Sequence, residues 1–245
     1  SEQKREVKMM VKGYSITGTK HIGNQDGFFI REESGKPYMY ITADGMGGHA
    51  AGDVAAKTAI DTIKEKLTDF SAKAITEAVN DANINIFAKA KSSPELEGMG
   101  TTVVLCMRKG NKIIIAHVGD SRAYVIENGI IKYVTKDHSY VQQLVDDGEI
   151  SAQEAKAHPM KNIITNAVGV QENVNVDIAE LEVNENSVIT LCSDGVSNVM
   201  TDERLAEISS DCSDDPAKTL CEEAQKLGSS DDVTAIVINL RGDIL

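Results

Sequence analysis

Apolar and β-branched residues fall in short runs along much of this chain, and glycine or acidic residues bound most of the runs. Four runs predict strands, at residues 38–43, 113–118, 188–192 and 233–238. Strands are also predicted at 103–107, 123–126, 130–134 and 174–183. Asn128-Gly129 between two of these runs is typical of a tight hairpin, so we expect antiparallel meanders.

Helical periodicity separates the groups of strands. Apolar residues recur on one face over Ala51–Leu67 and again over Ala72–Lys91, with no strand pattern between them. Two more helices are expected after residue 192, the second between Asp215-Pro216 and Gly228. Because helices come in pairs and strands in meanders, the pattern favours an α+β fold, with two packed antiparallel sheets and helices outside, over alternating βαβ units.

The pattern changes between residues 137 and 169, where short helical segments replace the strands. Ser151-Ala152-Gln153-Glu154 is typical of a helix-capping box, and Pro159 is expected to end that helix. We interpret this stretch as a small helical subdomain inserted into a single domain that spans residues 1–245.

Composition limits the classes of function. The chain has 245 residues, 41% of them hydrophobic, and a formal net charge of -13. With that charge and no basic cluster, nucleic acid is not an expected partner. No apolar stretch has the length of a membrane span and the N-terminal segment is charged, so we expect a cytoplasmic protein without a membrane partner. The cysteines show no metal-binding spacing and are interpreted as reduced packing residues.

Acidic residues mark the ends of four predicted strands. They stand in the pairs Asp44-Gly45, Gly119-Asp120, Asp194-Gly195 and Asp231-Asp232. Taken alone, each pair is typical of a turn, because Asp bonds to its own backbone and Gly supplies positive φ. Four such sites exceed what turns require, and we expect these carboxylates to meet at one edge of a sheet. Oxygen ligands in that number are those that Mg²⁺ and Mn²⁺ prefer.

The same region of the sequence is also compatible with other patterns. Residues 45–50 imitate a nucleotide-binding glycine loop, but a second helix follows in place of a parallel strand, and Asp44 would face a pyrophosphate. His117 lies in an apolar run and is expected to be a core residue, whereas His49 and His21 stand in short loops that can place them over a site. Arg122 is expected to form a structural ion pair.

The motifs together resemble the metal-dependent serine/threonine protein phosphatases of type 2C, the PPM family, and most closely its short bacterial members. The resemblance covers almost the full length, in order, and rests on Asn24-Gln25-Asp26, Asp44-Gly45-Met46-Gly47-Gly48-His49, Gly98-Met99-Gly100-Thr101-Thr102, His117-Val118-Gly119-Asp120-Ser121-Arg122, Ser193-Asp194-Gly195 and Asp231-Asp232-Val233-Thr234. It implies a four-layer α-β-β-α sandwich, with residues 137–169 as the flap found in that group.

The resemblance also implies a set of ligands and an activity. Two Mn²⁺ or Mg²⁺ ions would be bridged by Asp44, with the Gly45 carbonyl on one ion and Asp194 and Asp231 on the other. Asp26 would support this shell, and Asp120 with Asp194 would hold a third, weaker ion. A water activated by the metals would hydrolyse phosphoserine and phosphothreonine in proteins without a phosphoenzyme, which makes phosphoproteins and a cognate kinase the implied partners.

Some positions depart from the family pattern. His21 stands where many relatives have an arginine that binds the substrate phosphate, so we expect weaker and more pH-sensitive phosphate binding. Asp232 replaces a common Asn and is expected to add negative charge at the second metal, and Asn166 replaces a frequent flap arginine. His49 is the nearest candidate for the general acid. Two alternatives remain open, a catalytically weak regulator on the same fold and a metallohydrolase of small phosphoesters.

Overall fold

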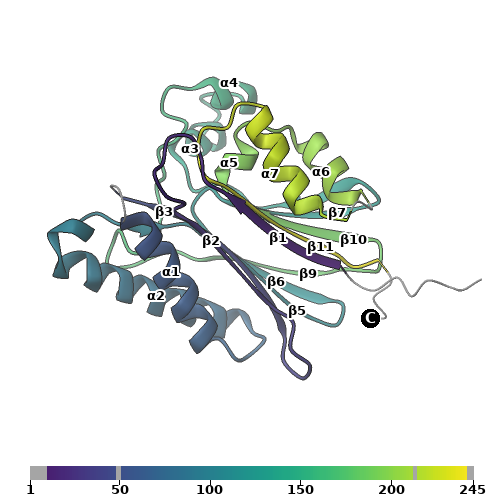
Figure 1. The fold of residues 1–245 in the computed structure, drawn as a ribbon, viewed down its shortest axis with the longest axis horizontal. Helices are drawn as coiled ribbons and strands as arrows, with labels where there is room; N and C mark the ends of the chain where they lie inside the picture. The colour runs from purple at the N-terminus through teal and green to yellow at the C-terminus, as the bar shows by residue number, and fades with distance from the viewer. Residues whose placement is uncertain (1–9, 48–50, 212–213, 242–245) are drawn as a thin grey trace, which may run out of the picture.

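The computed structural model describes residues 10–47, 51–211 and 214–241. Within these ranges, two antiparallel sheets pack face to face and helices cover their outer faces (Figure 1). One sheet has the order β1 (Met10–Ile16), β11 (Val233–Asn239), β10 (Ser187–Cys192), β7 (Arg122–Glu127) and β8 (Ile130–Val134). The other has the order β2 (Asp26–Arg31), β3 (Tyr38–Met46), β5 (Val103–Lys109), β6 (Lys112–Val118) and β9 (Asp177–Glu182), with β4 (Gly100–Thr101) paired to β3.

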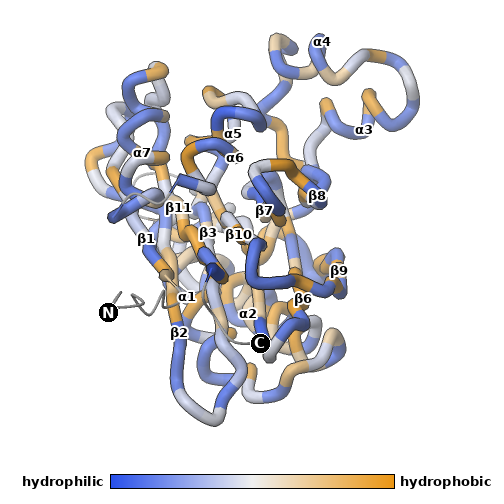
Figure 2. Tube along the Cα trace, turned by 90° about the vertical axis from the view of Figure 1, so that its right-hand side faces the viewer, coloured by the Kyte–Doolittle hydropathy of each residue, from blue (hydrophilic) through white to orange (hydrophobic). Residues whose placement is uncertain are grey.

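The helices form two groups on opposite sides of the sheets. Helices α1 (Ala51–Lys66) and α2 (Ala72–Ser92), followed by the 3₁₀ turn η1 (Pro94–Leu96), cover the β2–β9 sheet. Helices α5 (Asp194–Ser197), α6 (Asp202–Ser210) and α7 (Pro216–Lys226) cover the other sheet. The short helices α3 (Tyr140–Asp146) and α4 (Ala152–Ala157) lie at one end of the molecule, beyond the layers (Figures 1 and 2).

Three apolar layers hold the four structural layers together. The strand alternation decides where each side chain packs, because successive residues point to opposite faces of a sheet. On β3, Met39 and Ile41 pack toward the helices α1 and α2, whereas Tyr40 between them packs toward the other sheet. Figure 2 shows the corresponding concentration of hydrophobic positions on the central strands. The expected α-β-β-α sandwich is confirmed.

The local signals in the sequence agree with most of the elements. The Asn128-Gly129 pair adopts positive φ at both residues, 52° and 76°, and joins β7 to β8 as predicted. Ser151 and Glu154 form the predicted capping box at the start of α4. Among the described residues, none of the helices combines the length and the apolar character needed to cross a membrane.

Three expectations about the fold were wrong. The strand expected at 174–183 is formed only by Asp177–Glu182, and Val174 and Val176 instead pack as partly buried residues against the helical side of the core. Ser193-Asp194-Gly195 does not simply end a strand but opens the four-residue helix α5, which adds a third helix to the two expected after residue 192. The acidic strand ends belong to two different sheets rather than to one.

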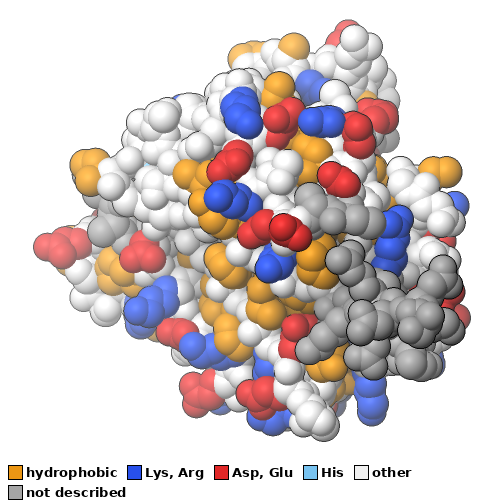
Figure 3. Space-filling view, turned by 45° about the vertical axis from the view of Figure 1, so that its right-hand side comes forward, with side chains coloured by type: hydrophobic (Ala, Val, Ile, Leu, Met, Phe, Trp, Pro, Cys, Tyr) orange, Lys and Arg blue, Asp and Glu red, His pale blue; other side chains and the backbone are white. Residues whose placement is uncertain are grey.

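The outer surface carries charges of both signs. On the face shown in Figure 3, acidic and basic side chains are interspersed around apolar ones. The negative charge of the chain is therefore not spread as a uniform acidic patch over this face. A separate group of carboxylates lies at the common end of the two sheets.

Candidate metal centre

A cleft of about 760 Å³ opens where both sheets end on the same side of the molecule. The four carboxylates predicted to meet, Asp44, Asp120, Asp194 and Asp231, all line this cleft. The strands β3 and β6 bring two of them from one sheet, and β10 and β11 bring the others from the second sheet. The sandwich therefore gathers these side chains by aligning the ends of two packed sheets.

Asp44 is fixed by its backbone on both sides. Its N–H donates to the Thr102 hydroxyl at 3.0 Å, and its carbonyl accepts from the Thr102 N–H and the Thr101 hydroxyl, both at 2.9 Å. Asp26 on β2 is its direct cross-strand partner. The next residue, Gly45, has no room for a side chain, since a Cβ there would lie 2.0 Å from the carbonyl oxygen of Gly52.

Two of the buried carboxylates have an oxygen without a hydrogen-bond partner. Ser193 donates to Asp26 Oδ2 at 2.8 Å, but Asp26 Oδ1 has no partner, and neither does Asp120 Oδ1. An unpaired buried acceptor is costly unless a cation or water satisfies it. Nothing in the sequence pattern identified Asp26, which was expected only from the family resemblance. Its pairing across β2 and β3 explains why it belongs to the cluster.

The carboxylates of this cluster disfavour one another's charge. Burial raises the pKa of Asp26 to about 7, and the charges of Asp232 and Asp194 add to that effect. Burial and neighbouring carboxylates likewise raise the pKa of Asp44 and of Asp120 well above their ordinary value. Such a group retains protons in the absence of cations, and divalent cations are the natural replacement for those protons. The residues present therefore fit a centre for hard, oxygen-preferring metal ions.

Asp194 follows the end of β10, whereas Asp231 precedes the start of β11. Asp194 begins α5, where Asn198 donates to its Oδ2 at 2.8 Å, and its carboxyl group shares a hydrogen bond with that of Asp44. Burial, followed by the charge of Asp231, raises the pKa of Asp194. Asp231 precedes β11 and accepts the Asp232 N–H at 3.1 Å. The two residues thus reach the cleft from neighbouring strands of one sheet.

Comparison with known proteins decides the family. The sequence model described as Protein phosphatase 2C matches residues 17–226. The chain belongs to the protein phosphatase 2C family. The serine/threonine phosphatase stp of Listeria innocua is 35% identical over 225 residues, which cover 88% of this chain and 89% of that protein.

Solved phosphatase 2C structures agree with this assignment. The Mycobacterium tuberculosis serine/threonine phosphatase PstP/Ppp superposes with a TM-score of 0.86 at 32% identity, covering 95% of this chain and 99% of that one. A structure of the catalytic domain of PstP in complex with two manganese ions has a TM-score of 0.83 at 31% identity, with 94% and 97% covered. The two packed sheets of this chain are those of the family.

The expected site residues of this phosphatase 2C chain divide into three groups. Asp26, Asp44, Asp120, Asp194 and Asp231 come together, and Gly45 lines the same cleft. His21 also lines the cleft, but its Nδ1 lies 2.9 Å from Asp232 Oδ2 and 3.8 Å from Asp231 Oδ1. His49 lies outside the described residues.

Asp232 is buried and hydrogen-bonded to the backbone of the β1–β2 loop. Its side chain is 2% exposed, and its two oxygens accept the backbone N–H groups of Gly18 at 2.7 Å and of Gln25 at 2.8 Å, besides contacting His21. Its charge still raises the pKa of Asp26. Asp232 therefore anchors the β1–β2 loop, residues 17–25, against the start of β11.

Sequence reasoning missed Lys20. It is the one Lys or Arg among the described residues that line the cleft, and no carboxylate of the described residues lies in ion-pair contact with its ammonium group. Burial and the charge of Asp231 raise the pKa of Asp194, and the positive charge of Lys20 offsets a small part of that rise. The sequence feature that could have identified Lys20 is its position directly before His21, the residue expected to bind the substrate phosphate.

A second titratable cluster adjoins the same strand ends. His117, His138 and Asp177 place their possible ligand atoms within 4.8 Å of one another. However, His138 Nδ1 accepts from the Gly119 N–H at 3.2 Å and from Asn166 Nδ2 at 2.9 Å, so its proton lies on Nε2, 3.2 Å from Asp177 Oδ2. Both ring nitrogens of His138 are thus in use.

His117 and two residues near this cluster, Asn166 and Arg122, have structural roles as well. His117 is 2% exposed and its Nε2 lies 2.8 Å from the Gly119 carbonyl, in agreement with its expected place in the core. Asn166, a neighbour of this cluster, also donates to the carbonyl of Asn175 at 2.8 Å, so it ties the flap to the segment that follows it. Arg122 forms the expected ion pair, with two 2.7 Å contacts to Asp137.

Proposed function

We propose that this phosphatase 2C chain hydrolyses phosphoserine and phosphothreonine in proteins, using two Mn²⁺ or Mg²⁺ ions held by the acidic centre. Membership of the family makes the chain a protein phosphatase. The observation that carries the proposal is the pair of buried, unpartnered oxygens, Asp26 Oδ1 and Asp120 Oδ1, among carboxyl groups of raised pKa. These carboxylate oxygens are free to act as ligands of a cation.

Each acidic residue has a proposed place in the centre. Asp44 would contact both ions, the Gly45 carbonyl one of them, and Asp194 with Asp231 the other, while Asp26 would support the shell. Asp120 together with Asp194 would hold a third, weaker ion. When bound, the ions supply charge neutralisation for phosphoryl oxygens and lower the pKa of water, so that no phosphoenzyme is needed.

The chain's own residues would orient the substrate. The hydroxyl groups of Thr101 and Thr102 hold the Asp44 backbone through hydrogen bonds, and the Asn198 side chain holds Asp194, so little reorganisation is needed during the reaction. Lys20 and His21 line the cleft and would face the phosphate dianion. His49 remains our candidate for the acid that protonates the leaving serine or threonine oxygen.

The reaction also sets the biological partners of the enzyme. A phosphatase of serine and threonine residues acts on the products of a serine/threonine kinase, so the proposed substrates are the phosphoproteins of a cognate kinase. The cytoplasm is the compartment in which we expect the two enzymes to meet.

The proposal is tested by hydrolysis of a phosphothreonine peptide and of p-nitrophenyl phosphate with Mn²⁺, with a chelator, and with the variant Asp194→Asn. We expect turnover of the peptide with Mn²⁺, and its loss in the other two conditions. Asp81→Asn, on the outer helix α2, is the matched control and should retain activity. Peptide turnover that survives both the chelator and Asp194→Asn would refute the mechanism, and turnover of the small ester alone would refute the substrate class.

A further inference from the structure

One wall of the cleft carries an isoleucine in full contact with solvent. Ile22, in the β1–β2 loop, is 99% exposed and lines the cleft beside Lys20 and His21. The flap contributes Asn162 and Ile164 to the lining of the same cleft. An acidic centre thus has apolar side chains at its mouth, one on the loop and one on the flap.

The exposure of Ile22 results from a fixed loop conformation. The N–H groups of Gly18 and Gln25 donate to the buried Asp232 carboxylate at 2.7 and 2.8 Å, and the Lys20 N–H donates to the Ser230 carbonyl at 3.1 Å. Gly18 fits only because it lacks a side chain, since a Cβ there would lie 2.2 Å from the Asp231 carbonyl carbon. Ile22 is therefore held toward solvent by bonds on both sides of it.

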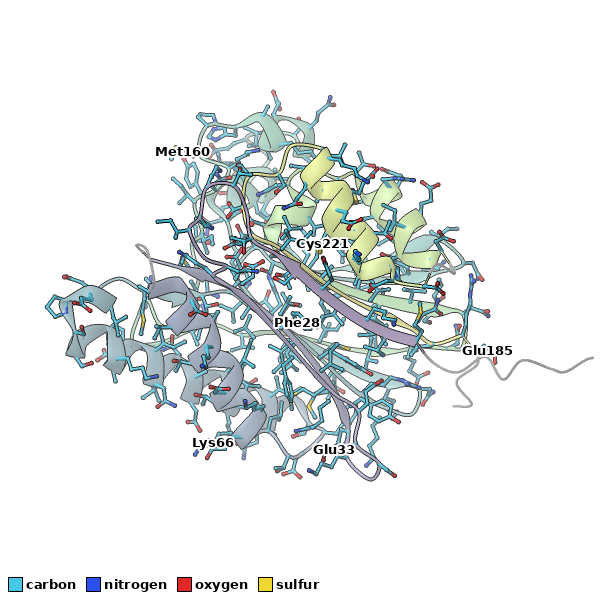
Figure 4. All side chains as sticks on the ribbon, in the orientation of Figure 1. Phe28, Glu33, Lys66, Met160, Glu185 and Cys221 are labelled. Atoms are coloured by element: carbon cyan, nitrogen blue, oxygen red, sulfur yellow. The ribbon has the colours of Figure 1, made fainter. Side chains whose placement is uncertain are left out.

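The flap side of the cleft is held by backbone bonds too. Ile164 forms a β-bridge with Ser139, and the Thr165 N–H donates to the His138 carbonyl at 2.9 Å. Two further flap residues, Met160 at 38% and Ile163 at 44% exposed, add apolar surface outside the lining of the cleft, and Figure 4 shows Met160 at the α3–α4 end of the molecule. Both walls are preformed, which lowers the entropic cost of binding a chain between them.

The charges of the cleft determine what can occupy it. With its cations bound, the acidic floor attracts a phosphate dianion, and Lys20 adds a positive charge at the same opening. When a phosphorylated residue of a protein substrate reaches the acidic residues at the floor of the cleft, the residues next to it in the substrate sequence must lie between the β1–β2 loop and the flap. We propose that Ile22 and Ile164 form an apolar rim, which binds an apolar side chain adjacent to the phosphorylated residue of a protein substrate. This inference rests on the proposed function and specifies its substrate class.

Two phosphothreonine peptides test the rim. They are identical except that the residues on both sides of the phosphothreonine are Leu in one and Ser in the other. We expect the native protein with Mn²⁺ to prefer the Leu peptide about tenfold in kcat/KM, the size of effect that one apolar contact gives. Ile22→Ser and Ile164→Ser should each reduce that preference to about threefold or less.

A matched control separates the rim from general surface effects. Ile84→Ser, on the outer helix α2 at 58% exposed, should retain the full preference. Equal kcat/KM for the two peptides in the native protein would overturn the proposal, as would a preference that survives both rim substitutions.

Peptide binding distinguishes the rim from the reaction. In the Asp194→Asn protein with Mn²⁺, fluorescence anisotropy gives the affinities of the two peptides independently of turnover. A preference for the Leu peptide that Ile22→Ser removes supports the rim even if the native protein hydrolyses neither peptide, which would refute only the proposed function. Hydrolysis of both peptides with no preference in binding or turnover would refute only the rim.

Discussion

The acidic centre and the histidine cluster contain side chains of the kind that bind metals, and they lie at the same end of the sheets. In the histidine cluster, Gly119, Asn166 and Asp177 use both ring nitrogens of His138. In the acidic centre, Asp26 Oδ1 and Asp120 Oδ1 are buried without a partner. One cluster is complete without ions, and the other is not.

This difference separates a structural cluster from a metal centre better than the spacing of ligand atoms does. The three ligand atoms of the histidine cluster lie close enough for one ion. Placing an ion on His138 Nε2 would move the proton to Nδ1, where it would oppose the N–H groups of Gly119 and Asn166. An ion in the acidic centre breaks no hydrogen bond at the two unpaired oxygens and relieves repulsion among the carboxylates.

The largest expected effect contrasts one carboxylate from each cluster. Asp44→Asn should lower kcat for a phosphothreonine peptide with Mn²⁺ on the order of 1,000-fold, as the loss of a central electrostatic group does. Asp177→Asn, in which an exposed carboxylate becomes an amide, should change kcat by about twofold or less. Steady-state kinetics of both variants checks this, and a comparable loss in Asp177→Asn would remove the distinction between the clusters.

The pH dependence of stability should have opposite signs in the two clusters. Burial lowers the pKa of His117 to about 4, so its contribution to stability is present above about pH 6.5 and is lost as pH falls toward 4. The full difference is about 3 kcal/mol. Burial raises the pKa of Asp26 to about 7, so in metal-free protein its contribution is present below about pH 4 and is lost as pH rises toward 7.

Urea unfolding of metal-free protein between pH 4 and 8 measures both contributions. His117→Asn should reduce the loss of stability that occurs as pH falls from about 6.5 toward 4. Asp26→Asn should reduce the loss that occurs as pH rises from about 4 toward 7. If neither substitution changes the pH profile of its own side, the protonation states assigned to the two clusters are wrong.

Metal binding should stabilise the protein through the acidic centre alone. Mn²⁺ at 100 times its dissociation constant raises the free energy of unfolding by about 2.7 kcal/mol when it binds only the folded chain. We expect this increase in the native protein and in His138→Asn, and its loss in Asp231→Asn. Thermal unfolding with and without Mn²⁺ provides the measurement, and an increase that depends on His138 would reverse the comparison.

The smallest expected effect concerns His21, which lies between the centre and its loop. His21→Arg should lower KM for the phosphothreonine peptide by about fivefold, because a guanidinium group binds phosphate with two N–H groups at once. Lys109→Gln, at the exposed end of β5, serves as a control for surface charge. An unchanged KM in His21→Arg would show that position 21 does not contact the phosphate.

The fold was predictable wherever a local pattern determined an element. The run at 38–43 and the pair Asn128-Gly129 specify a strand and a hairpin through side-chain alternation and positive φ. The start of β9 was not predictable, because Val174 and Val176 have a strand pattern but pack, partly buried, on the helical side of the core. Helix α5 is only four residues long, too short to show a period.

The carboxylates of the site were predictable from the sequence, but the residues that hold and surround them were not. Strand ends revealed Asp44 and Asp194, but the alignment of two sheets, which brings them together, is a tertiary feature. Asp232 was expected near the metals, and the structure turns it toward backbone N–H groups more than 200 residues away in sequence. Ile22 in a polar loop showed nothing unusual until its exposure was known.

The first described strand and the last are neighbours, and this has a consequence for protein synthesis. Strand β1 pairs with β11 along seven residues, and Asp231 and Asp232 immediately precede β11. A nascent chain that has not yet released β11 from the ribosome lacks one carboxylate of the centre and the anchor of the β1–β2 loop. If the acidic centre works as proposed, phosphatase activity therefore begins only after the domain has been translated through β11.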